Sequence, residues 1–112
     1  MFARVTPREM LAAAGAGDEL VREALQRAAT WIGIAAANVV TALHPDLIVL
    51  GGGVAELGDL LTSTVQDVIR DRVGMFPTES VQVVRSQLGE SAGLLGAIAL
   101  SQTLLLTQRT TP

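Results

Sequence analysis

The sequence predicts an α/β fold built around one β-α-β unit with flanking helices, in a sheet that this chain does not complete. Three observations predict it. An unbroken apolar run at 47–50 is followed at once by three glycines, which is typical of a buried parallel strand and its turn. An amphipathic helix at about 57–72 comes next. A second segment at 81–85 has the partial alternation of a strand at a sheet edge.

Two helices are expected before the first strand. Thr6 can cap the first helix, and Glu9 stands where a capping box needs an acidic residue. The glycines at 15–17 end this helix. Asp18 can then cap a second helix that runs to about Leu43.

The second half of that helix, residues 31–43, is apolar nearly all round. Only Asn38 and Thr41 interrupt it, so we expect it to be buried on all sides. His44 and Pro45 follow and end the helix. His44 is the only histidine, and we expect a helix-ending role for it rather than catalysis or metal binding.

A last helix is expected at about 91–106, followed by a frayed tail at 107–112. Small residues occupy its first turns. Gly93, Gly96 and Ala97 share one face, which allows another helix to approach closely.

The number of strands is small for the helices present. Two strands accompany four helices, whereas sheets usually contain about four to six strands. The run at 47–50 has the composition of a central strand, yet the chain offers it one neighbour. We therefore expect residues outside this chain, or a second copy, to complete the sheet. The chain has only 112 residues, of which 49% are hydrophobic, so it cannot bury all of its apolar surface. We therefore also expect exposed apolar helices and a homo-oligomer formed through them.

Composition excludes several classes of function. The net charge is −3, and the eight arginines form no basic stripe, so nucleic-acid binding by this segment is not expected. Cysteine is absent and histidine occurs once, so we assign no metal site.

The uncharged runs at 28–45 and 91–108 contain polar residues, so we predict buried soluble helices, no membrane contact and a cytoplasmic protein. No nucleophile–base set or carboxylate pair is evident, so we assign no catalytic residue.

The strongest sign of a ligand site is the turn after the first strand. Three glycines let a ligand lie against bare main chain, and ligands of open α/β sheets bind at the carboxyl ends of strands. The following helix offers unpaired N–H groups to an anion. A tight turn without a ligand is the alternative. The candidate binding residues are Gly51, Gly52, Gly53 and Val54.

Two named phosphate motifs fail at this turn. Glu56 stands where a dinucleotide fingerprint needs glycine, and Asp59 stands where a P-loop needs lysine. The charge of Asp59 favours contact with ribose or adenosine over a tightly held triphosphate. Glu56, together with Asp46, Glu90 and Ser91, is either a polar contact near the ligand or a cap.

Three blocks, in this order, resemble the carboxy-terminal part of the ROK family of repressors, open reading frames and sugar kinases. The first is the alanine-rich stretch 9–18, which ends in Gly-Asp. The second is His-Pro-Asp-Leu-Ile-Val-Leu-Gly-Gly-Gly-Val at 44–54, similar to the family's Asn-Pro-Glu-x-Ile-Val-Ile-Gly-Gly-Gly block with mild departures at His44 and Asp46. The third is 88–97, which contains Gly-Leu-Leu-Gly-Ala.

The resemblance implies an actin-like ATPase fold of the ribonuclease H-like, hexokinase type, with two lobes around a cleft. Residues 1–106 would then form a carboxy-terminal nucleotide-binding subdomain, and 107–112 a flexible tail. The turn would be the adenosine-side loop, and the last helix would connect the two lobes. The residues involved would be Gly51, Gly52, Gly53 and Val54 in the loop, and Gly93, Gly96 and Ala97 in the helix.

The resemblance also implies a function. A glucokinase-like member transfers the γ-phosphate of ATP, held with Mg²⁺, to a hexose, using an aspartate and a phosphate loop that this chain does not contain. The family's zinc site of histidine and cysteines is likewise absent from the sequence. We therefore expect the chain alone to be inactive. A sugar-responsive transcriptional repressor of the same family and a non-catalytic oligomerisation module are the alternatives.

Overall fold

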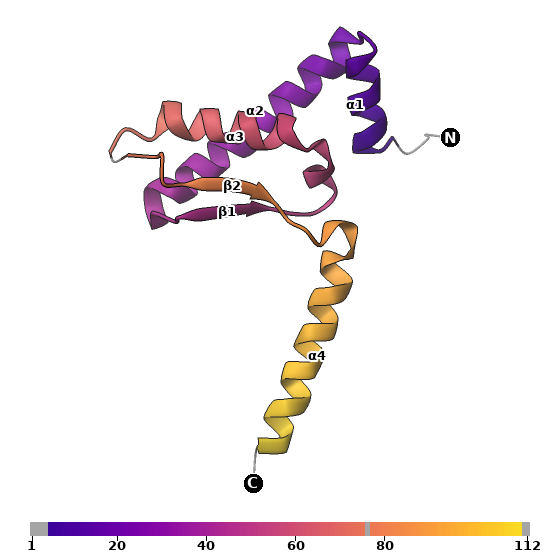
Figure 1. The fold of residues 1–112 in the computed structure, drawn as a ribbon, viewed down its shortest axis with the longest axis vertical. Coiled ribbons are helices and arrows are strands. Elements are labelled where there is room, and N and C mark those ends of the chain that lie inside the picture. The colour runs from indigo at the N-terminus through magenta and orange to yellow at the C-terminus, as the bar shows by residue number, and fades with distance from the viewer. Residues whose placement is uncertain (1–4, 76, 111–112) are drawn as a thin grey trace.

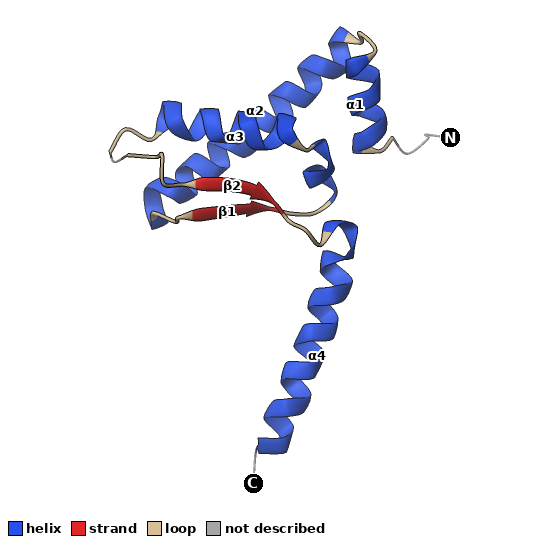
Figure 2. Ribbon diagram, viewed as in Figure 1, coloured by secondary structure: helices blue, strands red, loops and turns tan. Residues whose placement is uncertain are grey.

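The computed structural model describes residues 5–75 and 77–110, which form α-helices and one two-stranded sheet (Figures 1 and 2). In chain order the helices and strands are α1 (Pro7–Gly15), α2 (Glu19–Leu43), β1 (Leu47–Leu50), α3 (Asp59–Arg72), β2 (Gln82–Arg85) and α4 (Ala92–Thr110). Two short 3₁₀ helices, η1 (Gly53–Leu57) and η2 (Gly89–Ser91), follow the strands.

The first two helices begin where the sequence predicts. The side chain of Thr6 accepts a hydrogen bond from the Glu9 N–H at 3.2 Å, and the Asp18 carboxylate accepts one from the Val21 N–H at 3.2 Å. Each bond satisfies an N–H group that the first turn of a helix leaves without a partner. Both caps are therefore confirmed.

The two strands are parallel, with Leu47 opposite Gln82 and Leu50 opposite Arg85. α3 connects them, so the expected β-α-β unit is confirmed. The second strand begins at Gln82 rather than at residue 81. Among the described residues β1 has no neighbour other than β2, so a strand with the composition of a central strand lies at an edge.

The core lies where α2 and α3 pack together over one face of the sheet (Figure 1). Gly33 of α2 makes this packing close, because a Cβ atom there would lie 2.8 Å from the Cβ of Val68 on α3. The largest fully buried side chains are Leu61, Ile69, Val40 and Val65.

α2 differs from its prediction in one respect. Its second half was expected to be buried on all sides, but Trp31, Val39 and Leu43 are 66%, 45% and 74% exposed. That prediction is wrong for this chain, because α3 covers one side of the helix and the described residues provide no element for the other. α2 ends as predicted: His44 takes a left-handed conformation (φ 50°), and its N–H donates to the Val40 carbonyl at 2.9 Å.

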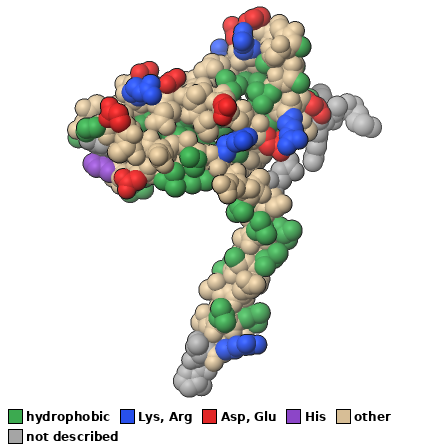
Figure 3. All heavy atoms as spheres, in the orientation of Figure 1, with side chains coloured by type: hydrophobic (Ala, Val, Ile, Leu, Met, Phe, Trp, Pro, Cys, Tyr) green, Lys and Arg blue, Asp and Glu red, His purple; other side chains and the backbone are tan. Residues whose placement is uncertain are grey.

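α4 leaves the rest of the molecule and projects away from it (Figure 1). It runs to Thr110, beyond the expected end at 106, so residues 107–110 are helical and 111–112 lie outside the described residues. No glycine or proline follows until Pro112, and the Thr107 hydroxyl donates to the Thr103 carbonyl within the helix. Every residue from Gly93 to Arg109 is exposed, and apolar side chains are spread along the helix (Figure 3).

Candidate functional site

The glycine turn leaves β1 and does not enter α3 directly. Gly52 has φ 80° and ψ −173°, a conformation that side-chain-bearing residues avoid, and its carbonyl accepts a hydrogen bond from the Ala55 N–H at 3.1 Å. The chain then forms η1, and Gly58 (φ 63°) turns it into α3 at Asp59. The sequence placed the start of this helix at about residue 57, which is the last residue of η1 and lies two residues before the observed start.

The segments that follow the two strands lie side by side. The Ser86 N–H donates to the Leu50 carbonyl at 2.8 Å, and a Cβ on Gly51 would lie 3.8 Å from the Cβ of Ser86. This places both carboxyl strand ends at one end of the sheet. An open depression of about 570 Å³ lies there, lined by Arg8, Gly52, Ala55, Glu56, Arg85, Ser86, Gln87 and Gly89.

Charged side chains of both signs line this depression. The Arg8 Nε lies 3.8 Å from a Glu56 carboxylate oxygen, and the Glu56 side chain is 21% exposed. Arg85 extends over the start of α3, where one of its guanidinium nitrogens would lie 3.6 Å from a Cβ on Gly58. The site therefore offers a largely buried acceptor and two cationic donors beside bare glycine backbone.

The structure brings together some of the residues that the sequence singled out. Gly52 and Glu56 line the depression, and Gly51, Gly53 and Val54 belong to the same turn. Asp46 lies at the opposite end of β1, where its carbonyl accepts from the Gln82 N–H at 2.9 Å, so it is not part of the site. Ser91 closes η2, and the side chain of Glu90 is not among those described.

Sequence reasoning missed the two arginines. Arg85 is the last residue of β2, so the rule that ligands bind at carboxyl strand ends could have identified it. Arg8 comes from α1, more than forty residues before the turn, and only the packing of α1 against η1 brings it near. No local pattern in the sequence predicts this contact between α1 and η1.

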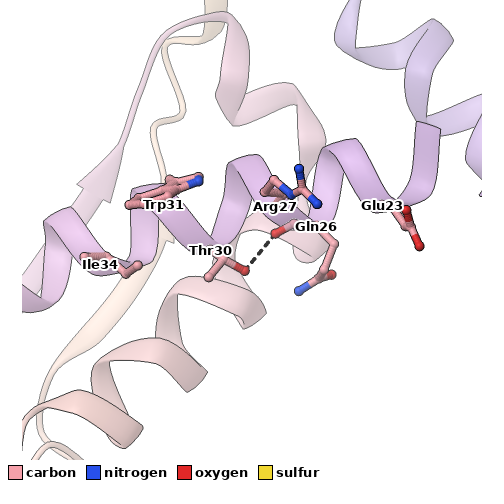
Figure 4. Close-up of a pocket in the computed structure, with 6 residues that line it drawn as sticks. All are labelled: Glu23, Gln26, Arg27, Thr30, Trp31 and Ile34. Carbon is pink, nitrogen blue, oxygen red and sulfur yellow. Dashed lines mark hydrogen bonds between the residues drawn. The ribbon is translucent and has the colours of Figure 1, made fainter. Parts of the chain in front are cut away.

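A larger depression, of about 740 Å³, runs along α2. Figure 4 shows its six lining side chains on this one helix, including the exposed Trp31. The Thr30 hydroxyl donates to the Gln26 carbonyl at 2.8 Å, and the Gln26 amide reaches the Thr64 hydroxyl of α3 at 3.3 Å. The Thr30 hydroxyl and the Gln26 amide thus each have a partner. All six lining residues belong to α2, so this groove does not bring side chains from different elements together around a ligand.

The described residues contain no group of three or more histidine, cysteine, aspartate or glutamate side chains placed to hold a metal ion. Among the helices in the described ranges, none combines the length and hydropathy needed to cross a bilayer.

Comparison with known proteins gives consistent matches. The chain is 28% identical over 96 residues to the xylose repressor of Caldicellulosiruptor bescii and 29% identical over 92 residues to the glucokinase of Halalkalibacterium halodurans. These alignments cover 86% and 82% of this chain but only 24% and 28% of the relatives. The chain thus spans about a quarter of the length of the curated relatives that it matches.

A solved structure shares the fold. The ROK family glucokinase of Streptomyces griseus, in complex with glucose and AMPPNP, superposes with a TM-score of 0.71 at 29% identity, over 83% of this chain and 30% of that one. The ROK family model matches residues 2–104, nearly the whole sequence. This chain is therefore a member of the ROK family.

Proposed function

We propose that this chain supplies the adenosine side of the ATP site in a glucokinase-like ROK sugar kinase. In this proposal residues 1–106 are the carboxy-terminal nucleotide-binding subdomain of an actin-like fold. The adenosine loop consists of Gly51, Gly52, Gly53 and Val54. The proposal depends on one observation, which is the open glycine turn at the carboxyl ends of both strands.

Gly53 is the most informative glycine of that turn. Gly52 needs glycine because of its positive φ, but Gly53 has an ordinary φ, and a Cβ there would meet no atom within 4 Å. Among the described residues, neither the conformation of Gly53 nor its packing explains the missing side chain. A ligand lying against the main chain at Gly53 does explain it.

The charges around the turn favour a nucleoside over a polyphosphate. The Glu56 carboxylate can accept hydrogen bonds from ribose hydroxyls or an adenine amino group, but it would repel a phosphate. Asp59 adds a second negative charge in the first turn of α3. Arg8 and Arg85 can balance these charges at the rim. We therefore assign adenosine to this chain and the phosphates to other parts of the protein.

α4 is proposed as the helix that connects the two lobes. Added Cβ atoms on Gly93 and Gly96 would meet nothing within 4 Å. Glycine in a helix interior costs about 1 kcal/mol relative to alanine, and no contact among the described residues offsets that cost at Gly96. Close approach of another element to the face formed by Gly93, Gly96 and Ala97 would offset it. A homo-oligomer formed through the exposed helices stays a prediction.

Phosphoryl transfer itself is assigned to the longer polypeptide. Transfer requires positioning and charge stabilisation of the γ-phosphate. The described residues of this chain offer only the adenosine side, so we expect no kinase activity from it alone. In the complete cytoplasmic protein, ATP with Mg²⁺ and a hexose are the proposed substrates. The glucose and AMPPNP bound by the Streptomyces griseus relative support this assignment.

Calorimetry with ADP and with AMPPNP tests the proposal. We expect binding by the 112-residue chain, and Gly53→Leu should weaken it at least about tenfold by filling the space beside the main chain. Gly74→Leu is the matched control, because a Cβ at Gly74 also meets nothing within 4 Å and Gly74 lies in the loop after α3. Binding that is absent at millimolar nucleotide would refute the proposal and favour a non-catalytic oligomerisation module.

A repressor is the second candidate, and one observation favours it. The xylose repressor matches as well as the glucokinase does, at 28% against 29% identity. In a repressor, the glycine turn at 51–54 would take part in sensing the sugar. A helix-turn-helix elsewhere in the longer polypeptide would identify a repressor, whereas a phosphate loop and a catalytic aspartate would identify a kinase.

A further inference from the structure

The Glu56 carboxylate holds a fixed and sheltered position in the depression at the carboxyl ends of the strands. Its neighbours Ala55 and Leu57 are 5% and 6% exposed, so they anchor the short helix η1 that carries it. The Glu56 side chain itself is only 21% exposed. An ionised group with this little access to water is costly to keep unless it has partners.

The partners of this carboxylate are incomplete within the chain. The Arg8 Nε lies 3.8 Å from one carboxylate oxygen, which is longer than a hydrogen bond. No described residue donates a hydrogen bond to either oxygen, and neither oxygen is sealed from solvent. An ionised carboxylate offers about four acceptor positions. Glu56 therefore has unused acceptor capacity that is open to the depression.

Arg8 acts on Glu56 from a separate helix. α1 packs against η1, and the Arg8 side chain is 81% exposed at the rim of the depression. Because its distance from the carboxylate is too long for a hydrogen bond, Arg8 attracts Glu56 by charge and leaves the acceptor positions to a ligand. A lysine at this position would supply the same charge.

The lining of the depression favours one part of a nucleotide. Apart from glycine and one alanine, the lining residues are polar or charged, namely Arg8, Glu56, Arg85, Ser86 and Gln87. Small-molecule sites for apolar rings have mostly apolar walls, whereas a ribose presents hydroxyl groups. Gly53 and Val54 lie outside the lining, and Val54 is 44% exposed, so both are available to the base. The depression therefore suits the sugar better than the purine.

We propose that Glu56 accepts hydrogen bonds from the 2′- and 3′-hydroxyls of the ribose, and that Arg8 is the positioning residue that holds its carboxylate. Two neighbouring hydroxyl donors match the two oxygens of one carboxylate. The site then selects ribonucleotides over 2′-deoxyribonucleotides. The inference rests on the proposed function and decides between the two contacts, ribose or adenine amino group, that are open to Glu56.

Calorimetry with ADP and 2′-deoxyADP measures this selection. The two ligands have the same base and phosphates, so the ratio of their dissociation constants isolates the hydroxyl. The 112-residue chain should bind 2′-deoxyADP at least about tenfold more weakly, because a hydrogen bond to an ionised acceptor is lost. Glu56→Ala should bring the ratio to about one. Asp71→Ala, which removes an exposed carboxylate near the end of α3, is the matched control and should change the ratio by less than about threefold.

Two variants test the positioning role of Arg8. Arg8→Met should lower the ratio at least about threefold, because the carboxylate is no longer held by charge. Arg8→Lys retains the charge and should keep the ratio within about twofold of that of the unsubstituted chain. Circular dichroism verifies that the variants are folded. A purely structural role of Arg8 would weaken both ligands equally, so an unchanged ratio in Arg8→Met would overturn the positioning role.

The other outcomes separate this inference from the proposed function. Equal binding of ADP and 2′-deoxyADP by the unsubstituted chain would overturn the inference and leave the proposed function intact. Inosine diphosphate lacks the adenine amino group; if it alone binds about tenfold more weakly than ADP, Glu56 contacts the base and the inference is wrong. A ratio that Glu56→Ala leaves unchanged would assign the hydroxyls to another group. Absence of binding by every nucleotide would refute the proposed function, and the inference with it.

Discussion

The body of the molecule, from α1 to β2, and the helix α4 contain similar apolar residues but use them differently. In the body, Leu61, Val65 and Ile69 are at most 1% exposed between α2 and α3. In α4, leucines of the same kind are 43–67% exposed, and the main neighbour of the helix is the short η2. Apolar content therefore does not by itself produce a core, which also needs a facing element.

This difference indicates which contacts this chain contains and which it lacks. A helix that is apolar on all sides is stable in water only when other structure covers it. α2 is partly in that condition too, since its α3-facing side is buried while Trp31 and Leu43 are exposed. The body can thus be tested as a folding unit, and α4 as a helix without a partner.

The largest expected effect comes from truncating one leucine in each region. Leu61→Ala should lower the free energy of unfolding by about 3 kcal/mol, because it removes a fully buried side chain and leaves a cavity. Leu105→Ala, at a site 61% exposed, should change it by less than about 0.5 kcal/mol. Urea denaturation followed by circular dichroism measures both. Equal losses would mean that α4 is packed in solution.

Glycine substitutions should have opposite signs in the two regions. Gly33→Ala places a Cβ 2.8 Å from the Val68 Cβ, which forces α2 and α3 apart and should cost about 1 kcal/mol net of the gain in helix propensity. Gly96→Ala meets no atom and should stabilise α4 by about 1 kcal/mol, visible as slower amide exchange along that helix.

The double variant Gly33→Ala with Val68→Ala provides the control for this pair. If the Cβ contact is the cause, shortening Val68 should recover part of the loss, because the clashing methyl groups are removed. A double variant that is destabilised by the full sum of the two single changes would show that the close crossing is not responsible.

Local patterns in the sequence were enough to predict most elements. Thr6, Asp18 and His44 mark helix ends through caps and a left-handed turn, which depend only on neighbouring residues. The strand at 47–50 and its parallel partner follow from the same kind of pattern. The prediction that was wrong concerned the burial of α2. Whether this helix is covered on all sides depends on elements far away in the sequence or outside it.

The candidate site shows the same division. The glycine turn and Glu56 were predictable because they follow a strand directly, whereas Arg8 reaches the site only through the packing of α1 on η1. The start of α3 was misplaced because the glycines permit a 3₁₀ turn that periodicity alone does not reveal. Long-range packing is therefore the part that pattern reasoning could not supply.

The smallest expected effect is also the most direct test of the comparison. Deleting residues 92–112 removes all of α4 but none of the buried core residues. The free energy of unfolding of the body should therefore change by less than about 0.5 kcal/mol in urea denaturation. The shortened chain should also be more soluble, because the helix presents an uncharged apolar surface up to Arg109. A loss of more than about 1 kcal/mol would mean that α4 folds back onto the body in solution.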